Sequence, residues 1–123
     1  MTPKHLNPDG HPLTPDQKRN LQLLADKITI LEIASGLDFY STSGFRTKAE
    51  QQRINPVNPR SCHTEGLAVD VADKDKKIWD FVIDNLELVV KLGFYLENKL
   101  YTPRHVHFQL RAPRSRNRIF IPY

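Results

Sequence analysis

The chain has 123 residues, the size of one domain, and its 39% hydrophobic and 26% charged residues exclude an intrinsically disordered protein. No apolar run approaches the ~20 residues that cross a bilayer, and no apolar segment near the start resembles a secretory signal, so we expect a protein made in the cytoplasm. The single cysteine, Cys62, excludes an internal disulfide and a Cys-rich zinc finger, and the net charge of +4 favours polyanionic partners.

The N-terminal third predicts an irregular arm followed by a long helix. Residues 1–13 contain three prolines, which remove backbone donors and disfavour helix in the preceding residue. Thr14 and Gln17 can form a capping box, so we expect a helix from there to residue 35, ended by Gly36. Apolar residues recur on one side of this helix at helical spacing and predict its core-facing side: Leu21, Leu24, Ile28 and Leu31.

Short strands and helices are predicted for the middle of the chain. Residues 37–43 predict a strand, and a second capping box starts a helix over 47–54. An irregular loop over 55–59 leads to a strand at 67–72 and a second long helix at 75–92. The core candidates of that second helix are Ile78, Phe81, Val82, Leu86, Val89 and Val90.

Two more strands are predicted at 94–97 and 105–111, ahead of a basic C-terminal segment at 112–123. No acidic residue follows Glu97, so this end of the chain is positively charged. Together these elements predict one α+β domain over residues 1–123, with a small antiparallel sheet and helices packed on one of its faces.

Three polar signals lie on or beside otherwise apolar strands. Asp70 alternates with large apolar residues, and His105 and His107 share one face of their strand. His63 lies just before the Asp70 strand, and Gly66 permits a sharp turn between them. Taken singly, each signal also fits a solvated side chain on an open sheet face. Together, two histidines and one aspartate form a zinc ligand set that leaves a fourth position for water.

A family resemblance rests on these residues. Residues 61–70 follow the pattern S-x-H-x-x-G-x-A-x-D, residues 105–107 read H-x-H, and residues 43–46 read S-G-F-R. This set, and the order of elements over roughly 14–111, resembles the zinc D-Ala-D-Ala metallopeptidases, and in particular their short phage lysin-like members. The superfamily also contains lysostaphin-type peptidases and the Hedgehog domain, so the resemblance implies a Hedgehog/D-Ala-D-Ala-peptidase-like fold.

The resemblance implies a role for each matching residue. His63, Asp70 and His107 match the zinc ligands, so we expect one Zn²⁺ per chain. Arg46 matches the arginine that anchors a carbonyl or carboxylate of the substrate, and Ser61 matches a serine of the substrate site. We expect Cys62 not to be a ligand, because a thiolate would take the open position and adjacent residues tend to point apart.

One position departs from the family pattern. Many members carry an acidic general base three residues before the last ligand, where this chain has Arg104, which cannot accept a proton. Strand alternation places Glu97 on the predicted site face, and we rank it first as the general base. His105 is the second candidate for the base. If Glu97 is the base, we expect His105 to stabilise the oxyanion or to shuttle a proton. Glu65 is a third, weaker candidate.

The interpretation that follows is a zinc metallopeptidase of bacterial peptidoglycan stems, either an endolysin-like endopeptidase or a D,D-carboxypeptidase. It would act at the cell wall after release by lysis or another export route, and we expect a monomer. The alternative is a catalytically inactive zinc-containing binding module, supported by the absent acid at Arg104. A nucleic-acid binder would use the basic end of the chain but leaves the His/Asp pattern unexplained, so we expect no nucleic-acid partner.

Overall fold

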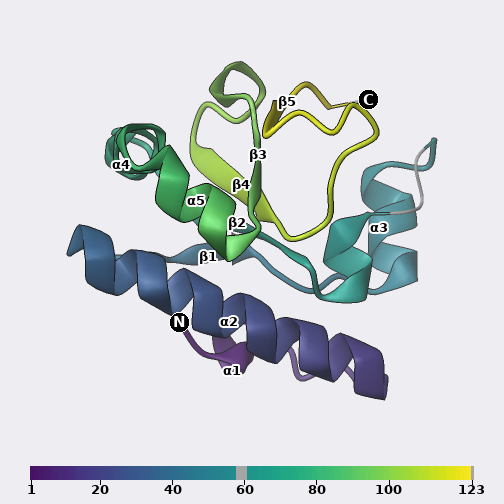
Figure 1. Ribbon diagram of the computed structural model, residues 1–123. Coiled ribbons are helices and arrows are strands. Elements are labelled where there is room, and N and C mark those ends of the chain that lie inside the picture. The colour runs from purple at the N-terminus through teal and green to yellow at the C-terminus, as the bar shows by residue number, and fades with distance from the viewer. Residues whose placement is uncertain (58–60, 123) are drawn as a thin grey trace.

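A computed structural model describes residues 1–57 and 61–122 (Figure 1). The predicted loop at 55–59 therefore lies partly outside the described residues, as does Tyr123. The helices are α1 Pro3–Leu6, α2 Pro15–Ser35, α3 Lys48–Ile54, α4 Lys77–Asp84 and α5 Leu86–Leu92, with 3₁₀ helices η1 Cys62–Glu65 and η2 Lys99–Tyr101. The strands are β1 Ser41–Ser43, β2 Ala68–Ala72, β3 Tyr95–Glu97, β4 His105–Gln109 and β5 Ile119–Phe120.

Local signals in the sequence explain where α2 begins and ends. The Gln17 amide donates to Thr14 Oγ1 at 3.1 Å and the Thr14 amide donates to Gln17 Oε1 at 2.8 Å, which is the predicted capping box. Gly36 ends the helix in the left-handed conformation, with a φ of 68°. All four predicted core residues of this helix are buried: Leu21, Leu24, Ile28 and Leu31.

A five-stranded sheet forms the centre of the molecule, in the order β1-β2-β4-β3-β5. The β1–β2, β2–β4 and β3–β4 pairs are antiparallel, as predicted, but β5 pairs parallel with β3. In Figure 1, α2 runs below the sheet and α4 and α5 lie to one side of it. The α+β class is thus confirmed, and the sheet is mixed at the β5 edge.

The sheet has an apolar face in the core and a polar face. Val69 and Val71 of β2 and Val106 and Phe108 of β4 are fully buried in the cluster that α2 also enters. Because side chains alternate along a strand, the residues between them face the other way. That polar face carries the residues on which the candidate site depends.

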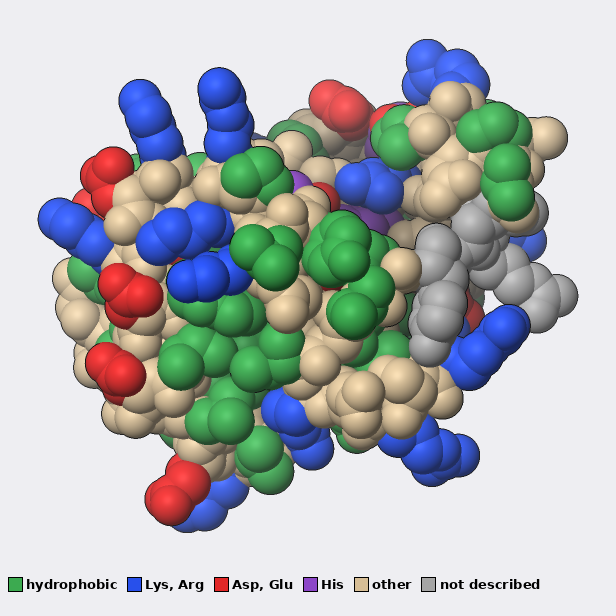
Figure 2. Space-filling view, turned by 90° about the horizontal axis from the view of Figure 1, so that it is seen from above, with side chains coloured by type: hydrophobic (Ala, Val, Ile, Leu, Met, Phe, Trp, Pro, Cys, Tyr) green, Lys and Arg blue, Asp and Glu red, His purple; other side chains and the backbone are tan. Residues whose placement is uncertain are grey.

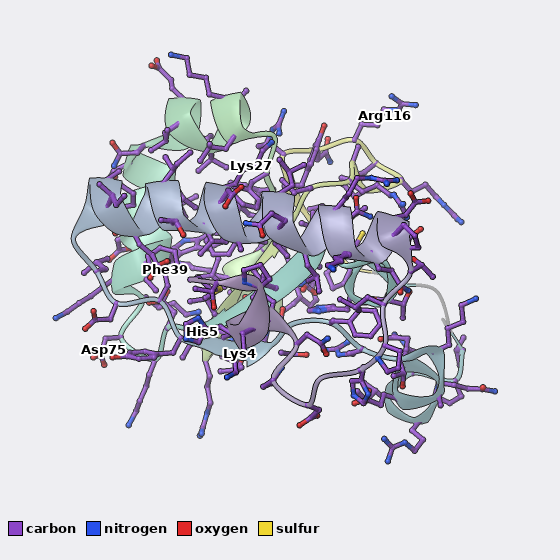
Figure 3. The ribbon with its side chains drawn as sticks, turned by 90° about the horizontal axis from the view of Figure 1, so that it is seen from below. Lys4, His5, Lys27, Phe39, Asp75 and Arg116 are labelled. Carbon is purple, nitrogen blue, oxygen red and sulfur yellow. The ribbon has the colours of Figure 1, made fainter. Side chains whose placement is uncertain are left out.

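Residues 1–13 are not wholly irregular, which corrects the prediction. Pro3 begins the one-turn helix α1, because proline is accepted at the first helical position, where an amide has no partner in any case. Leu6 of this helix is fully buried, and its carbonyl accepts a 2.7 Å hydrogen bond from the Phe45 amide. Figure 3, a view from below, shows α1, which carries Lys4 and His5, beside α2.

Two further predictions differ from the structure. The predicted helix at 75–92 is broken at Asn85, which has non-helical angles and whose side-chain amide donates to Phe81 O at 2.9 Å. Val90, a predicted core residue, is exposed because it lies on the outer side of α5. The basic segment 112–123 contains β5, a strand that the sequence did not predict, with Phe120 buried, and Arg116 projects from the surface in Figure 3.

Among the described residues, no helix combines the length and the apolar character that a membrane span requires.

Candidate metal centre

His63, Asp70 and His107 come together in the structure, and one possible ligand atom from each lies within 4.8 Å of the others. His63 is in η1, Asp70 in β2 and His107 in β4. Asp70 and His107 are direct partners in the antiparallel β2–β4 ladder, which explains how positions 37 residues apart meet. All three side chains are buried.

His63 is oriented by the main chain around it. Its Nδ1 lies 2.8 Å from the Gly44 carbonyl oxygen, which can only accept, so Nδ1 carries the hydrogen. Nε2 then faces the cluster, 3.6 Å from Asp70 Oδ2. The Ser61 hydroxyl accepts from the His63 amide at 3.2 Å, and Gly66, with a φ of 75°, turns the chain into β2.

In His107 it is Nδ1 that faces the cluster, whereas in His63 it is Nε2. Its Nδ1 is 2.8 Å from Asp70 Oδ1, and its Nε2 is 2.8 Å from Gln109 Oε1. Burial opposes the protonation of His107, but the hydrogen bond and charge of Asp70, together with Gln109 and Glu97, outweigh burial and raise its pKa. For His63, burial prevails and lowers the pKa.

The charge of Asp70 suits it to bind a cation. Burial favours its neutral form, but the neighbouring imidazoles of His107 and His63 together outweigh burial and hold the pKa of this carboxyl well below its usual range. The cluster thus offers one carboxylate and two imidazole nitrogens, with the other nitrogen of each ring bonded to an oxygen. That set fits a catalytic zinc ion, which takes three protein ligands and keeps one position open.

A cavity of about 330 Å³ opens over the cluster. Figure 2 looks onto this side of the molecule, where purple histidine side chains are visible in a hollow between blue basic ones. Every residue that we singled out as a ligand, substrate contact or first- or second-ranked base lines this one cavity: Arg46, Ser61, His63, Asp70, Glu97, His105 and His107.

Arg46 is fixed in the cavity wall by three side chains. Its Nε donates to Ser43 Oγ at 3.0 Å, Nη1 to Gln51 Oε1 at 3.0 Å and Nη2 to Asp70 Oδ2 at 3.4 Å. The Arg46 amide also donates to the His63 carbonyl at 3.2 Å. The guanidinium is therefore held beside the candidate metal ligands rather than extended into solvent.

Glu97 and His105 stand in the cavity wall, whereas Glu65 does not. Leu96 is fully buried, so alternation turns Glu97 to the polar face, and burial raises the pKa of the Glu97 carboxyl. His105 Nε2 lies 3.7 Å from Asp70 Oδ1, and burial lowers the pKa of His105. Glu65 pairs with Arg111 outside this cavity, so it stays the weakest of the three candidate bases, and Arg104 is exposed.

Cys62 lies next to His63 but does not belong to the possible ligand set found among the described residues. Burial raises the pKa of its thiol.

Two partners of the candidate ligands were not predicted from the sequence: Gly44, whose carbonyl meets His63, and Gln109, which meets His107. Strand alternation puts Gln109 on the face of His107, but it does not show that the two side chains are hydrogen-bonded. Gly44 acts through its main chain, which no residue pattern reveals.

Comparison with known proteins gives one informative result. No family model matches the chain, and no curated protein matches it. Among solved structures, the L-Ala D-Glu endopeptidase ChiX of Serratia marcescens matches with a TM-score of 0.55 over 86% of this chain and 95% of that one. The chain shares the fold of this endopeptidase. The two sequences are 21% identical over the match, so the likeness concerns the fold.

Proposed function

We propose that this protein is a zinc-dependent peptidase that hydrolyses peptide bonds in the stems of bacterial peptidoglycan. The observation that carries the proposal is the buried group of His63, Asp70 and His107 in a cavity whose wall also holds Glu97 and His105. The shared fold with an L-Ala D-Glu endopeptidase supports an endopeptidase ahead of a D,D-carboxypeptidase. Its place of action would be the cell wall.

His63 Nε2, a carboxylate oxygen of Asp70 and His107 Nδ1 would hold the metal, because these atoms face one another in the cluster. When bound, zinc lowers the pKa of a water molecule and polarises a carbonyl group. The low exposure of all three ligands strengthens the attraction of Asp70 for a cation, while the cavity over the cluster leaves room for water.

Glu97 is proposed as the general base. Its raised pKa makes its carboxylate a better acceptor for the proton of the attacking water, which it then passes to the leaving amine. His105 is proposed to stabilise charge on the carbonyl oxygen or to share in the proton transfer, since its imidazole faces the same cavity.

Arg46 and Ser61 are proposed to position the substrate. The three hydrogen bonds of Arg46 fix the guanidinium, so it can meet a carbonyl or carboxylate oxygen without a large loss of side-chain freedom. Ser61 lines the same cavity while its hydroxyl caps η1.

The second candidate function is a zinc-containing binding module without catalysis. Arg104 favours it, because an arginine stands where many members of the resembled family carry the base.

Metal analysis tests the ligand set. The purified protein is expected to hold about one zinc ion per chain, and His63→Ala is expected to lose it, because two protein ligands hold zinc poorly. Equal zinc in both proteins would reject the assignment.

Digestion of purified peptidoglycan tests the reaction, with new peptide termini identified by mass spectrometry. Glu97→Gln keeps the shape of the side chain but removes the proton acceptor, so it is expected to lose about 10²–10⁴-fold in rate with zinc retained. Glu65→Gln is the matched control, because its carboxylate lies outside the cavity, and it is expected to keep full activity.

The same digestion separates the alternatives. If Glu97→Gln digests as well as wild type, the base is His105, and His105→Ala must then slow the reaction. If the wild-type protein with full zinc releases no peptide, the binding module replaces the enzyme.

A further inference from the structure

Gln109 lies two residues beyond His107 on β4, and its side chain is on the same polar face. Its amide group is buried between two partners. Gln109 Oε1 is 2.8 Å from His107 Nε2, and Gln109 Nε2 donates to the Arg111 carbonyl at 2.8 Å. The side chain thus connects the ring of a candidate metal ligand to the main chain at the end of β4.

These contacts determine which atom of the Gln109 amide faces the histidine. A carbonyl oxygen only accepts, so the group that faces Arg111 must be the NH₂. The oxygen of the amide then faces His107. Because that oxygen also only accepts, the hydrogen between the two residues belongs to His107 Nε2.

This hydrogen bond leaves Nδ1 as the nitrogen of His107 that faces Asp70 and the centre of the cluster. A metal-bound histidine commonly donates its other N–H to an oxygen, which fixes the ring and its tautomer. For His63 that oxygen is the Gly44 carbonyl, so each of the two histidines has one such partner.

We propose that Gln109 is a positioning residue that holds His107 with its hydrogen on Nε2 and so presents Nδ1 to the metal. The proposal rests on the metal site of the proposed function, but not on the identity of the substrate. It assigns to Gln109 no contact with the reacting groups. Its effect is on the affinity for zinc, and partners of this kind are typically worth ~10–100-fold in metal affinity.

The test compares two substitutions of similar length. Gln109→Met fills the same space without an acceptor, and zinc affinity, measured by competition with a chromophoric chelator, is expected to fall ~10–100-fold. Gln109→Glu keeps an acceptor for His107 Nε2 and is expected to recover most of the affinity. Gln51→Met is the matched control, because Gln51 is a buried glutamine of the same cavity that bonds to Arg46 instead.

A spectroscopic measurement separates positioning from general stability. Long-range ¹H–¹⁵N NMR of the zinc-loaded wild-type protein is expected to show zinc on His107 Nδ1 and a slowly exchanging hydrogen on Nε2. Gln109→Met is expected to lose the slow exchange, whereas Gln51→Met keeps it.

Three results would overturn the proposal: zinc on Nε2 of His107 in the wild type, a folded Gln109→Met variant with wild-type affinity, or a wild-type protein that binds no zinc. The wild-type spectrum decides even if Gln109→Met fails to fold. A protein that binds zinc as described but cleaves no peptide rejects the peptidase and leaves this inference standing.

Discussion

The two histidines of the candidate metal centre are held in different ways. His63 donates to a main-chain oxygen, the carbonyl of Gly44, 19 residues away. His107 donates to a side chain, Gln109, two residues away on its own strand. The first support depends on how a distant turn is packed, whereas the second depends on one amide group. A substitution of Gln109 removes the partner of His107 directly. The Gly44 carbonyl belongs to the main chain, so a substitution can displace it only by changing the packing of the turn.

The packing behind the first support involves the N-terminal helix α1. The Phe45 amide donates to the Leu6 carbonyl at 2.7 Å, which fixes the turn that contains Gly44. A Cβ atom added to Gly44 would lie 2.3 Å from the Leu6 carbonyl oxygen, so only glycine fits at this approach. The His63 side of the site therefore depends on residues near the start of the chain, and the His107 side does not.

Leu6→Ala tests the packing behind His63 and is expected to have the largest effect on the free energy of unfolding. Leu6 is fully buried in the core, and truncation of a buried leucine costs about 2–5 kcal/mol of unfolding free energy. Urea denaturation measures it, with Leu23→Ala at an exposed position of α2 as the control, expected within about 0.5 kcal/mol of wild type. A cost below about 1 kcal/mol for Leu6→Ala would show that α1 does not support the turn.

Gly44→Ala is expected to lower the unfolding free energy less than Leu6→Ala, but to affect zinc binding more directly. The added methyl group meets main-chain atoms of Leu6, and such overpacking typically costs about 1–3 kcal/mol. Moving the turn also moves the oxygen that holds His63, so zinc affinity is expected to fall. Gly36→Ala is the control, since it strains a left-handed residue with nothing within 4 Å and should destabilise the protein without loss of zinc affinity. Unchanged zinc binding in Gly44→Ala would mean that the carbonyl of residue 44 does not orient His63.

The smallest effect is expected from Cys62→Ser. Cys62 adjoins His63 in η1 but is outside the possible ligand set, so both zinc content and peptidoglycan digestion should match the wild type. The change in unfolding free energy should stay within about 0.5 kcal/mol, as for substitutions without a special role. Loss of metal in this variant would show that the ligand set is wrong.

Signals close together in the sequence were enough to predict much of the fold and the composition of the site. The Thr14 capping box and Gly36 determine the ends of α2, because their hydrogen bonds join residues a few positions apart. Strand alternation placed Glu97, Asp70 and His107 on one polar face, because successive side chains of a strand always point to opposite sides. The His–Asp–His group could therefore be proposed before the strands were placed side by side.

Contacts between distant residues were decided only by the tertiary structure. Nothing near residue 3 indicates that Leu6 will be buried against the turn at Gly44, and nothing near residue 119 indicates a parallel pairing with β3. The carbonyl that orients His63 carries no side-chain signal, and the hydrogen of His107 is placed by an amide whose direction depends on the Arg111 carbonyl. A sequence pattern specifies which side chains share a face, whereas the direction of a hydrogen bond depends on atoms brought together by folding.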